Sequence, residues 1–444
     1  MRGSQKRVLI IGADGLRPDM ITREQMPVLT ELMENGTRYS NFKSAYPSET
    51  RVSMSTLTTG VYPGKHGIVA NLMYMPGFKE NFVQTGNHLH LLSYEEETGE
   101  PILMAPTLGD RLNKRGMQLS AAASSSPGAS LLWNIHHPEK IMNPATDYGQ
   151  STLAEIHKKY ATDLTEDIDG VKRKKSLWAL QAFISEQLKA EANRVLVLWL
   201  AEPDSSQHYY GLGSRENLQA LRMVDECLKE VLDHIKKLGM QEDTDILFLS
   251  DHGHSTVEAI GSLTDHVDKA CVELNINNQF TAVGNYIYGK HGTAPAYNDW
   301  AALIRWLQRQ DWCGTIYTDK SLGKFAGVFS IEEILGPITH NRAPELIINP
   351  VGTNEENEHG IPGTVKTLTD SNILRASHGT MSPYDRHAVC IGSGPSFERG
   401  KTDEGVYSIV DIVPTICEIL GLDEDGFDGR SLLNECHITP TNNR

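Results

Sequence analysis

The chain has 444 residues, of which 39% are hydrophobic and 22% charged, and its formal net charge at pH 7 is −16. This composition is typical of a soluble globular protein, and the length predicts one large α/β domain with an insertion, or two to three domains. The acidic balance argues against a nucleic-acid polymer as partner, because phosphate backbones are bound by dense positive charge. No apolar run approaches the roughly 20 residues of a membrane-spanning helix, so we expect no membrane partner.

The N-terminus and the cysteines favour a cytoplasmic protein. The first apolar stretch ends at Gly12 and meets Asp14, whereas a secretion signal has a longer apolar region and a small-residue cleavage site. The cysteines show no CxxC or zinc-ribbon spacing, so we expect free, mainly buried thiols and no sulfur ligand in any metal site. They are Cys227, Cys271, Cys313, Cys390, Cys417 and Cys436.

Short apolar runs alternate with helical patterns along the chain. The predicted buried strands are Val8–Ile11, Val195–Leu200 and Ile246–Leu249. The predicted helices are Met26–Asn35, Thr107–Lys114 and Asn217–Lys237. This alternation predicts an α/β fold with a doubly wound, mainly parallel sheet and helices on both of its faces.

The character of the chain changes between residues 261 and 370. Tryptophans and tyrosines accompany mixed strand and helix signals there, and we interpret Trp300, Trp306 and Trp312 as the core of an insertion. A strand-like segment at His387–Ile391 and an apolar helix around Val410–Leu420 follow. We therefore expect an inserted α+β cap at residues 261–370 and a single catalytic core made of residues 1–260 and 371–444.

Three predicted strands lead to carboxylates: the first to Asp14, the second to Asp204 and the third to Asp251 with His252. Because ligands gather at the carboxyl ends of parallel strands, these side chains are expected on one rim of the sheet. Carboxylates with imidazoles, and no thiolate, form a ligand set for catalytic zinc or a similar divalent ion. Each such Asp is also common as a turn or helix-capping residue, so the pattern alone leaves both roles open.

Five motifs then follow one another between positions 12 and 379. They are Gly12–Pro18, Ala45–Arg51 with Leu57–Ile68, Glu202–Gly211, Ser250–Gly253 and Ser377–Gly379. Together they resemble the nucleotide pyrophosphatase/phosphodiesterase family of the alkaline phosphatase superfamily. The resemblance implies an alkaline phosphatase-like fold and a phosphodiesterase or nucleotide pyrophosphatase that acts on a small phosphate ester through a phosphothreonine.

The resemblance also implies particular residues and cofactors. Thr50 would be the nucleophile, and Asn71 matches the asparagine that binds the phosphate. Two divalent metal ions are implied, for which the ligand types favour Zn, although Mn or Fe could fill one site. One ion would be held by Asp14, Thr50, Asp251 and His252, and the other by Asp204, His208 and His378.

The chain departs from the family pattern at Arg51, at Val52-Ser53, which replace an expected Pro-Asn pair, and at His254. Arg51 follows the nucleophile where many relatives carry an aromatic residue, and His254 replaces a more usual apolar residue. Arg51 could bind a further anionic oxygen of the substrate, which would favour a monoester, a phosphonate or a charged leaving group. It could equally form a salt bridge with Glu49 or face solvent. His254 could orient a ligand carboxylate, lie in the substrate cleft or be a plain turn residue.

Other functions stay open. A phosphomonoesterase or phosphonate hydrolase of the same superfamily would use the same two-metal centre. A phosphomutase and a non-catalytic binding protein are more distant alternatives, although none of the expected ligands is missing from the chain. A sulfatase would need a Cys-x-Pro-Ser-Arg setting, which this sequence lacks.

Overall fold

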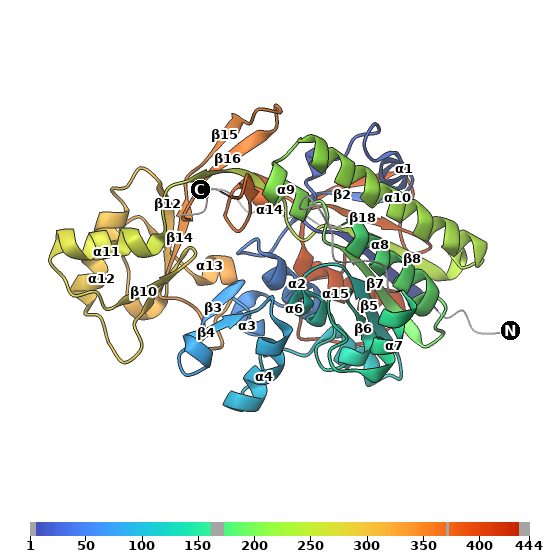
Figure 1. Ribbon diagram of the computed structural model, residues 1–444, viewed down its shortest axis with the longest axis horizontal. Coiled ribbons are helices and arrows are strands. Elements are labelled where there is room, and N and C mark those ends of the chain that lie inside the picture. The colour runs from blue at the N-terminus through green and yellow to red at the C-terminus, as the bar shows by residue number, and fades with distance from the viewer. Residues whose placement is uncertain (1–5, 161–172, 370–372, 435–444) are drawn as a thin grey trace.

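The computed structural model describes residues 6–160, 173–369 and 373–434. Within them an eight-stranded mixed sheet forms the larger part of the molecule, on the right in Figure 1. Its strand order is β19-β2-β18-β8-β1-β7-β5-β6. The strands are β1 (Arg7–Ala13), β2 (Thr37–Lys43), β5 (Gln118–Ala123), β6 (Ile141–Met142), β7 (Asn193–Leu200), β8 (Thr244–Leu249), β18 (Cys390–Ser393) and β19 (Lys401–Ser408). Neighbours are parallel, except that β18 runs antiparallel to both β8 and β2.

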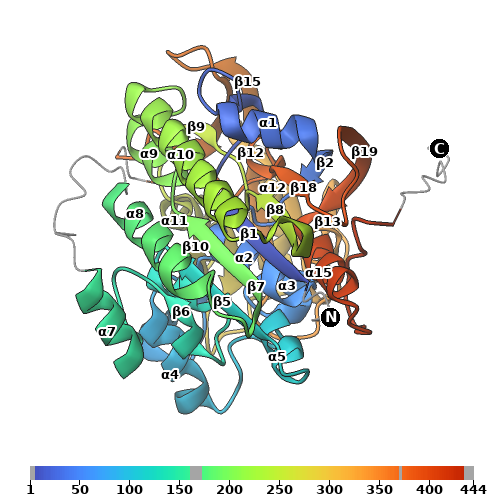
Figure 2. The same ribbon diagram turned by 90° about the vertical axis from the view of Figure 1, so that its right-hand side faces the viewer.

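Helices cover both faces of this sheet (Figure 2). Along β1, Val8 and Ile10 belong to one hydrophobic core and Leu9 and Ile11 to another, because successive side chains of a strand point to opposite faces. The first core contains residues of α2 (Thr50–Thr59), α6 (Pro127–Leu131) and α15 (Ile412–Leu420). The second contains residues of α1 (Pro27–Asn35), α8 (Arg173–Ala182) and α10 (Arg215–Lys237). The predicted doubly wound α/β fold is confirmed.

The predicted elements match the observed ones within two residues at each end, with one exception. For example, α10 begins at Arg215 because the Ser214 side chain accepts a hydrogen bond from the backbone N–H of Asn217. The strand predicted at His387–Ile391 is wrong in its bounds, since β18 spans Cys390–Ser393. His387 instead ends the short helix α14 (Pro383–Arg386), whose last turn it caps.

A second sheet lies at one end of the molecule, on the left in Figure 1, with the strand order β10-β11-β14-β12-β13. Its strands are β10 (Phe280–Val283), β11 (Tyr286–Gly289), β12 (Cys313–Thr318), β13 (Val328–Ser330) and β14 (Leu346–Pro350). Two helices pack with it, α11 (Leu263–Leu274) and α12 (Tyr297–Leu307), around a separate hydrophobic core that includes Trp300, Trp306 and Trp312. This part of the chain has the α+β character that was expected of an insertion.

A third sheet joins segments from both sides of the proposed domain boundaries. Its order is β15-β16-β9-β17, with β15 (Gly352–Glu356), β16 (Pro362–Thr367), β9 (Ser255–Ala259) and β17 (Ala376–Ser377). Strand β9 pairs with β16 in parallel and with β17 antiparallel, so residues before 261 and after 370 share a sheet with residues between them. Asp370 lies outside the described residues, and the division at 261 and 370 stays a prediction.

The cysteines in the described part of the chain are free thiols. Cys227, Cys271, Cys390 and Cys417 are buried and Cys313 is half-buried, as expected, while Cys436 lies outside the described residues. Within the described ranges, no helix combines the length and the apolar character that crossing a membrane requires. The cytoplasmic location stays a prediction.

Candidate active site

The carboxyl ends of β1, β7 and β8 bring three carboxylates to one rim of the central sheet. Asp14 follows β1 directly, Asp251 follows β8 after one residue, and Asp204 opens α9 (Asp204–Tyr210) beyond β7. Backbone hydrogen bonds fix this arrangement: Asp14 N donates to Leu200 O at 2.9 Å, and Asp204 N donates to Asp14 O at 2.9 Å. The convergence expected from the strand ends is therefore observed.

The first group of side chains surrounds the Nε2 atom of His252. Thr50 Oγ1 lies 3.2 Å from it, Asp251 Oδ2 3.3 Å and Asp14 Oδ1 3.4 Å. Thr50 Oγ1 also lies 3.5 Å from Asp14 Oδ1. Thr50 is the first residue of α2, and all of these side chains are buried.

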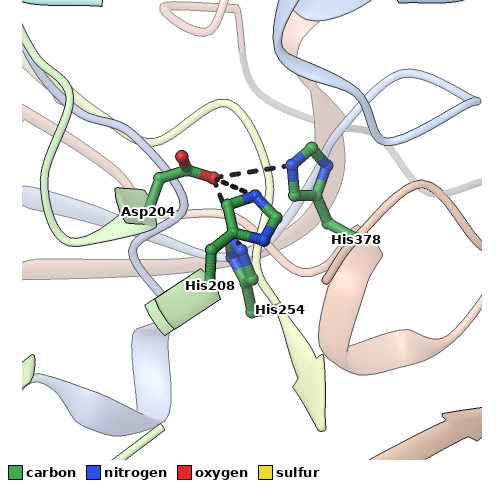
Figure 3. Close-up of side chains that lie close together, drawn as sticks. All are labelled: Asp204, His208, His254 and His378. Atoms are coloured by element: carbon green, nitrogen blue, oxygen red, sulfur yellow. Dashed lines mark ion pairs between the residues drawn. The ribbon is translucent and has the colours of Figure 1, made fainter. Parts of the chain in front are cut away.

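The second group surrounds Oδ1 of Asp204 (Figure 3). The Nε2 atoms of His208, His254 and His378 lie 3.2, 3.4 and 3.5 Å from this oxygen. Despite these short distances, Asp204 Oδ1 and both ring nitrogens of His254 are buried without a hydrogen-bond partner in the described part of the chain. Donor atoms that converge without bonding to one another suit a shared cation.

Three of the imidazoles are oriented by backbone carbonyls. His208 Nδ1 lies 2.8 Å from Ala376 O, His252 Nδ1 2.9 Å from Gly253 O, and His378 Nδ1 2.7 Å from Ser48 O. When Nδ1 carries the proton and donates to a carbonyl, Nε2 keeps its lone pair and points at the opposite side of the ring. This tautomer is the one that a metal-binding histidine adopts.

Burial and mutual repulsion shift the pKa values of the carboxyl groups. Burial, together with the charges of Asp251 and Asp204, raises the pKa of Asp14 well above its ordinary value. Burial also raises the pKa of Asp251 to about 7. For Asp204, burial opposes ionisation, but the neighbouring imidazoles, His208 first, hold the pKa well below its ordinary value. A cation would relieve the cost of keeping these groups ionised.

The pKa values of the imidazoles are shifted in different directions. Burial and the charge of His208 lower the pKa of His254, and burial and His252 lower the pKa of His378, both well below the ordinary value. The pKa of His208 is raised, since attraction to Asp204 outweighs the effect of burial. Neutral imidazoles and buried carboxylates are donors that fit a divalent cation of the zinc type.

A cavity of about 370 Å³ opens onto this rim. Its lining includes Thr50, Arg51, Asn71, Asp204, His208 and His378 together with Glu49, Ala70, Leu72, Val283, Gly284, Tyr286 and Ser377. The other predicted site residues, Asp14, Asp251, His252 and His254, lie buried beside it and do not line it. His254 is thus buried beside the cavity, and its role stays a prediction.

Arg51 does not form the alternative salt bridge with Glu49. The Glu49 carboxylate accepts hydrogen bonds from the backbone N–H of Asn71 and, at 3.1 Å, from the hydroxyl of Tyr286. Arg51 Nε is buried and has no hydrogen-bond partner among the described residues, and burial lowers the pKa of this guanidinium. The backbone N–H of Arg51 donates to Asn71 Oδ1 at 3.3 Å, which ties the asparagine to the start of α2.

Several supporting residues could not be identified from the sequence. Trp199 Nε1 donates to Asp14 Oδ2 at 3.3 Å, and Gly15 N donates to Asp251 Oδ1 at 3.1 Å. Tyr286 reaches Glu49 from a strand 237 residues away in the chain. A tryptophan inside an apolar strand and a tyrosine in an insertion carry no local signal of such roles, whereas Gly15 belongs to a recognised motif.

The chain is similar in sequence to several known proteins. The family model described as type I phosphodiesterase / nucleotide pyrophosphatase matches residues 8–353. Human bis(5'-adenosyl)-triphosphatase is 24% identical over 425 residues, which cover 94% of this chain and 78% of that protein. Human ectonucleotide pyrophosphatase/phosphodiesterase family member 1 is 26% identical over 249 residues, which cover 55% of this chain and 23% of that protein.

A solved structure shares the fold. Murine ectonucleotide pyrophosphatase/phosphodiesterase 5, an inactive threonine-to-alanine variant in complex with AMP, superposes with a TM-score of 0.64 at 18% identity. The superposition covers 96% of this chain and 97% of that chain. The alkaline phosphatase-like fold that the motifs implied is confirmed.

Proposed function

Because the chain belongs to the type I phosphodiesterase / nucleotide pyrophosphatase family, and is thus a hydrolase of phosphate ester bonds, we propose that it cleaves a small phosphate ester with Thr50 as nucleophile and two divalent metal ions. The observation that carries this proposal is the position of the Thr50 hydroxyl, 3.2 Å from His252 Nε2 and 3.5 Å from Asp14 Oδ1. The position of Thr50 as the first residue of α2 does not by itself require its hydroxyl to face buried acids and imidazoles.

The residues of the two groups would hold one ion each. Asp14, Thr50, Asp251 and His252 would bind the first, and Asp204, His208 and His378 the second. When bound, such ions lower the pKa of a coordinated hydroxyl and stabilise negative charge on phosphoryl and leaving oxygens. Zinc suits these nitrogen and oxygen donors, and no thiolate is needed.

The protein groups then have distinct roles. Thr50 Oγ1 would lose its proton and attack phosphorus as the bond to the leaving oxygen breaks, which gives a phosphothreonine and releases the alcohol or phosphate, whose oxygen takes up a proton from solvent. Asn71 accepts from the Arg51 N–H through Oδ1, so its amide nitrogen is available to donate to a phosphoryl oxygen. The N-terminus of α2 adds a favourable dipole for the phosphoryl group. Water then attacks phosphorus and releases Thr50, with net retention after two inversions.

Arg51 supports a substrate with a second anionic group. Its guanidinium lines the cavity, while Glu49 is bonded elsewhere. A charged leaving group, such as the second half of a pyrophosphate, would satisfy it. The names of the relatives, a bis(5'-adenosyl)-triphosphatase and an AMP complex, favour a nucleotide-like diester or pyrophosphate. The same arginine would serve a phosphomonoesterase or phosphonate hydrolase, which is the second candidate function.

A panel of substrates with matched variants tests the proposal. We expect metal-replete enzyme to hydrolyse bis-p-nitrophenyl phosphate, p-nitrophenyl phosphate or phenylphosphonate monoester, and the fastest of the three assigns the ester class. Thr50→Ala should abolish turnover, whereas Thr50→Ser should retain part of it and accumulate a phosphoenzyme on acid quench. Full activity of Thr50→Ala, or a wild-type protein that binds no metal, would contradict the proposal.

A further inference from the structure

His254 is a buried imidazole whose ring nitrogens are both unsatisfied. Its side chain is 0% exposed, and neither Nδ1 nor Nε2 has a hydrogen-bond partner in the described part of the chain. Buried polar atoms are nearly always paired, because an unpaired one costs on the order of 1–3 kcal/mol. An exception beside a candidate metal centre calls for a ligand rather than for a neighbouring side chain.

The ring of His254 points at the same oxygen as two predicted metal ligands. Its Nε2 lies 3.4 Å from Asp204 Oδ1, which His208 and His378 approach to 3.2 and 3.5 Å (Figure 3). One donor atom from each of the four residues lies within 4.8 Å of those of the others. His254 Nε2 makes no hydrogen bond to this oxygen although it lies 3.4 Å from it, so a hydrogen bond does not explain the position of this ring.

The separations between Asp204 Oδ1 and the three imidazole nitrogens match those between ligands of a tetrahedral cation. Zinc bonds to nitrogen and oxygen are about 2.0–2.1 Å long, so two ligands of a tetrahedral ion are separated by about 3.3–3.4 Å. The three distances from Asp204 Oδ1 lie between 3.2 and 3.5 Å. The Thr50, Asp14 and Asp251 oxygens lie at the same spacing, 3.2 to 3.4 Å, from His252 Nε2. His254 Nε2 therefore lies at the separation from Asp204 Oδ1 that is expected between two ligands of one ion.

The surrounding structure holds His254 in this position. Gly15 has a φ of +71°, and a Cβ atom there would lie 2.8 Å from His254 Cε1, so only glycine leaves room for the ring. Arg17, which is 1% exposed, donates through Nη1 to His254 O at 3.0 Å and to Pro362 O at 2.9 Å. His254 also directly precedes β9, whose Ser255 pairs with Ser377, the residue before His378.

We propose that His254 is a fourth protein ligand of the ion held by Asp204, His208 and His378. The inference rests on the proposed two-metal function and goes beyond it, because it closes the tetrahedral set of one ion with protein atoms. A substrate oxygen then has to enter as a fifth ligand, whereas a site with three protein ligands offers an open position. His254 Nδ1 has no carbonyl acceptor, unlike the Nδ1 atoms of His208 and His378. We therefore expect its bond to the ion to be the weakest of the three imidazoles.

Cadmium-113 binding to the wild-type protein labelled with ¹⁵N-histidine tests the assignment directly. The number of imidazole nitrogens split by ¹¹³Cd counts the histidine ligands. We expect four: one from His252 and three from His208, His254 and His378. Three split nitrogens would overturn the role of His254 and leave the two-metal proposal intact. No splitting and no bound cadmium would instead contradict the proposed function itself.

Cobalt titration of His254→Phe provides a second readout. Phenylalanine keeps a planar ring in the buried space but removes both nitrogens. We expect cobalt affinity at one of two sites to fall more than 10-fold, and the visible absorption of that site to shift, because a donor atom is lost. His208→Phe should do the same, and His291→Phe, at an exposed histidine, should do neither. Unchanged spectra and two tightly bound ions in a folded His254→Phe would overturn the inference; if that variant does not fold, His254→Gln and the cadmium count decide.

Discussion

Among the described residues that line the cavity beside the candidate nucleophile, Arg51 is the one arginine or lysine. It lies one residue after Thr50, and its Nε is buried without a hydrogen-bond partner among the described residues. Glu49, the acid nearest in sequence, is bonded to Asn71 and Tyr286 instead. Because the Arg51 guanidinium lines the cavity and does not pair with Glu49, a single variant can test whether it binds a charged group of the substrate.

We expect Arg51→Ala to lower kcat/KM about 10- to 100-fold for substrates with a second anionic group, since a charge-assisted hydrogen bond contributes about 1.5–3 kcal/mol. A diester with a neutral leaving group should lose much less. Steady-state rates on p-nitrophenyl phosphate and bis-p-nitrophenyl phosphate compare the two cases. Arg51→Lys, which keeps the charge but not the planar fork, is the matched control. Equal losses on both substrates would rule out this role.

Asn71 offers a second residue-level prediction. Its amide nitrogen is expected to donate to a phosphoryl oxygen, and removal of one such donor typically lowers kcat about 10²–10³-fold. We expect Asn71→Ala to show this loss while its metal content, measured by mass spectrometry, stays equal to that of the wild type. A fall in bound metal together with kcat would show that Asn71 acts on the metal centre instead.

How far single residues could be predicted depends on whether a motif carries them. Asp14, Asp204 and Asp251 follow apolar strands, and the family motifs add Thr50 and His378, so their convergence was expected. The salt bridge considered between Arg51 and Glu49 was wrong, because Tyr286 arrives from a distant strand and takes one carboxylate oxygen. A contact across 237 residues leaves no trace in local sequence.

At the scale of elements, the turn after β1 determines how the two candidate metal groups meet. Gly15 has a positive φ, its N–H bonds to Asp251, and its missing side chain leaves space for His254. Gly99, at the end of α4 (His88–Thr98), has a similar φ of +74°, but a Cβ atom there would meet nothing within 4 Å. A comparison of alanine substitutions at the two glycines therefore separates the effect of backbone strain from the effect of a methyl group placed against His254.

We expect Gly15→Ala to lower both the melting temperature and the number of bound metal ions. The left-handed backbone costs about 1–2 kcal/mol with a side chain, and the added Cβ displaces His254. Gly99→Ala should show only the strain and keep its full metal content. Differential scanning calorimetry and metal analysis distinguish the two. Equal metal content in both variants would show that the turn tolerates the methyl group.

The predictability of elements follows from the length of their patterns. Helix α10 and the three central strands have long, uniform apolar patterns, and their bounds were predicted within two residues. The segment that contains β18 is short and follows α14. The strand predicted from its apolar residues therefore begins three residues before the observed one. Its antiparallel direction depends on pairing with β8 and β2, which no local pattern encodes.

At the scale of the whole molecule, the net charge of −16 and the acidic rim both favour cation binding. Burial raises the pKa of Asp251 to about 7, and burial together with the charges of Asp251 and Asp204 raises the pKa of Asp14 well above its ordinary value. Below about pH 7 Asp251 is mainly protonated in the metal-free protein, so a cation has to displace its proton to bind. The raised pKa of His208 acts in the same direction, because a ligand imidazole has to be neutral.

We therefore expect metal affinity to rise with pH through about 7 and to level off above it. Chelator competition titrations with zinc at pH 6, 7 and 8 measure this dependence. Binding should also release protons into a weak buffer near pH 6.5, and less so at pH 8. An affinity that is constant across this range would show that the carboxylates are already ionised without metal.

The arrangement of the insertion could be predicted only in part. A change in composition marks residues 261–370 as distinct, and the tryptophans there pack in their own core. The third sheet could not be predicted from the sequence. Strands β9 and β17 lie outside that range, and β9 pairs both with β17 and with β16, which lies inside it. Strand pairing between segments so far apart is set by the folded topology and not by their composition.

The third sheet, in which β16 pairs with β9, has a practical consequence for protein engineering. Strand β16 lies beside β9, and the ends of β9 and β17 carry His254 and His378. Arg17 ties the first residue of β16, Pro362, to the same turn. A chimera that exchanges the insertion at residues 261–370 for that of a relative would thus have to keep residues 362–367 paired with β9 in the same register. If the chimera does not retain this pairing, we expect His254 and His378 to be displaced and cation binding to be lost.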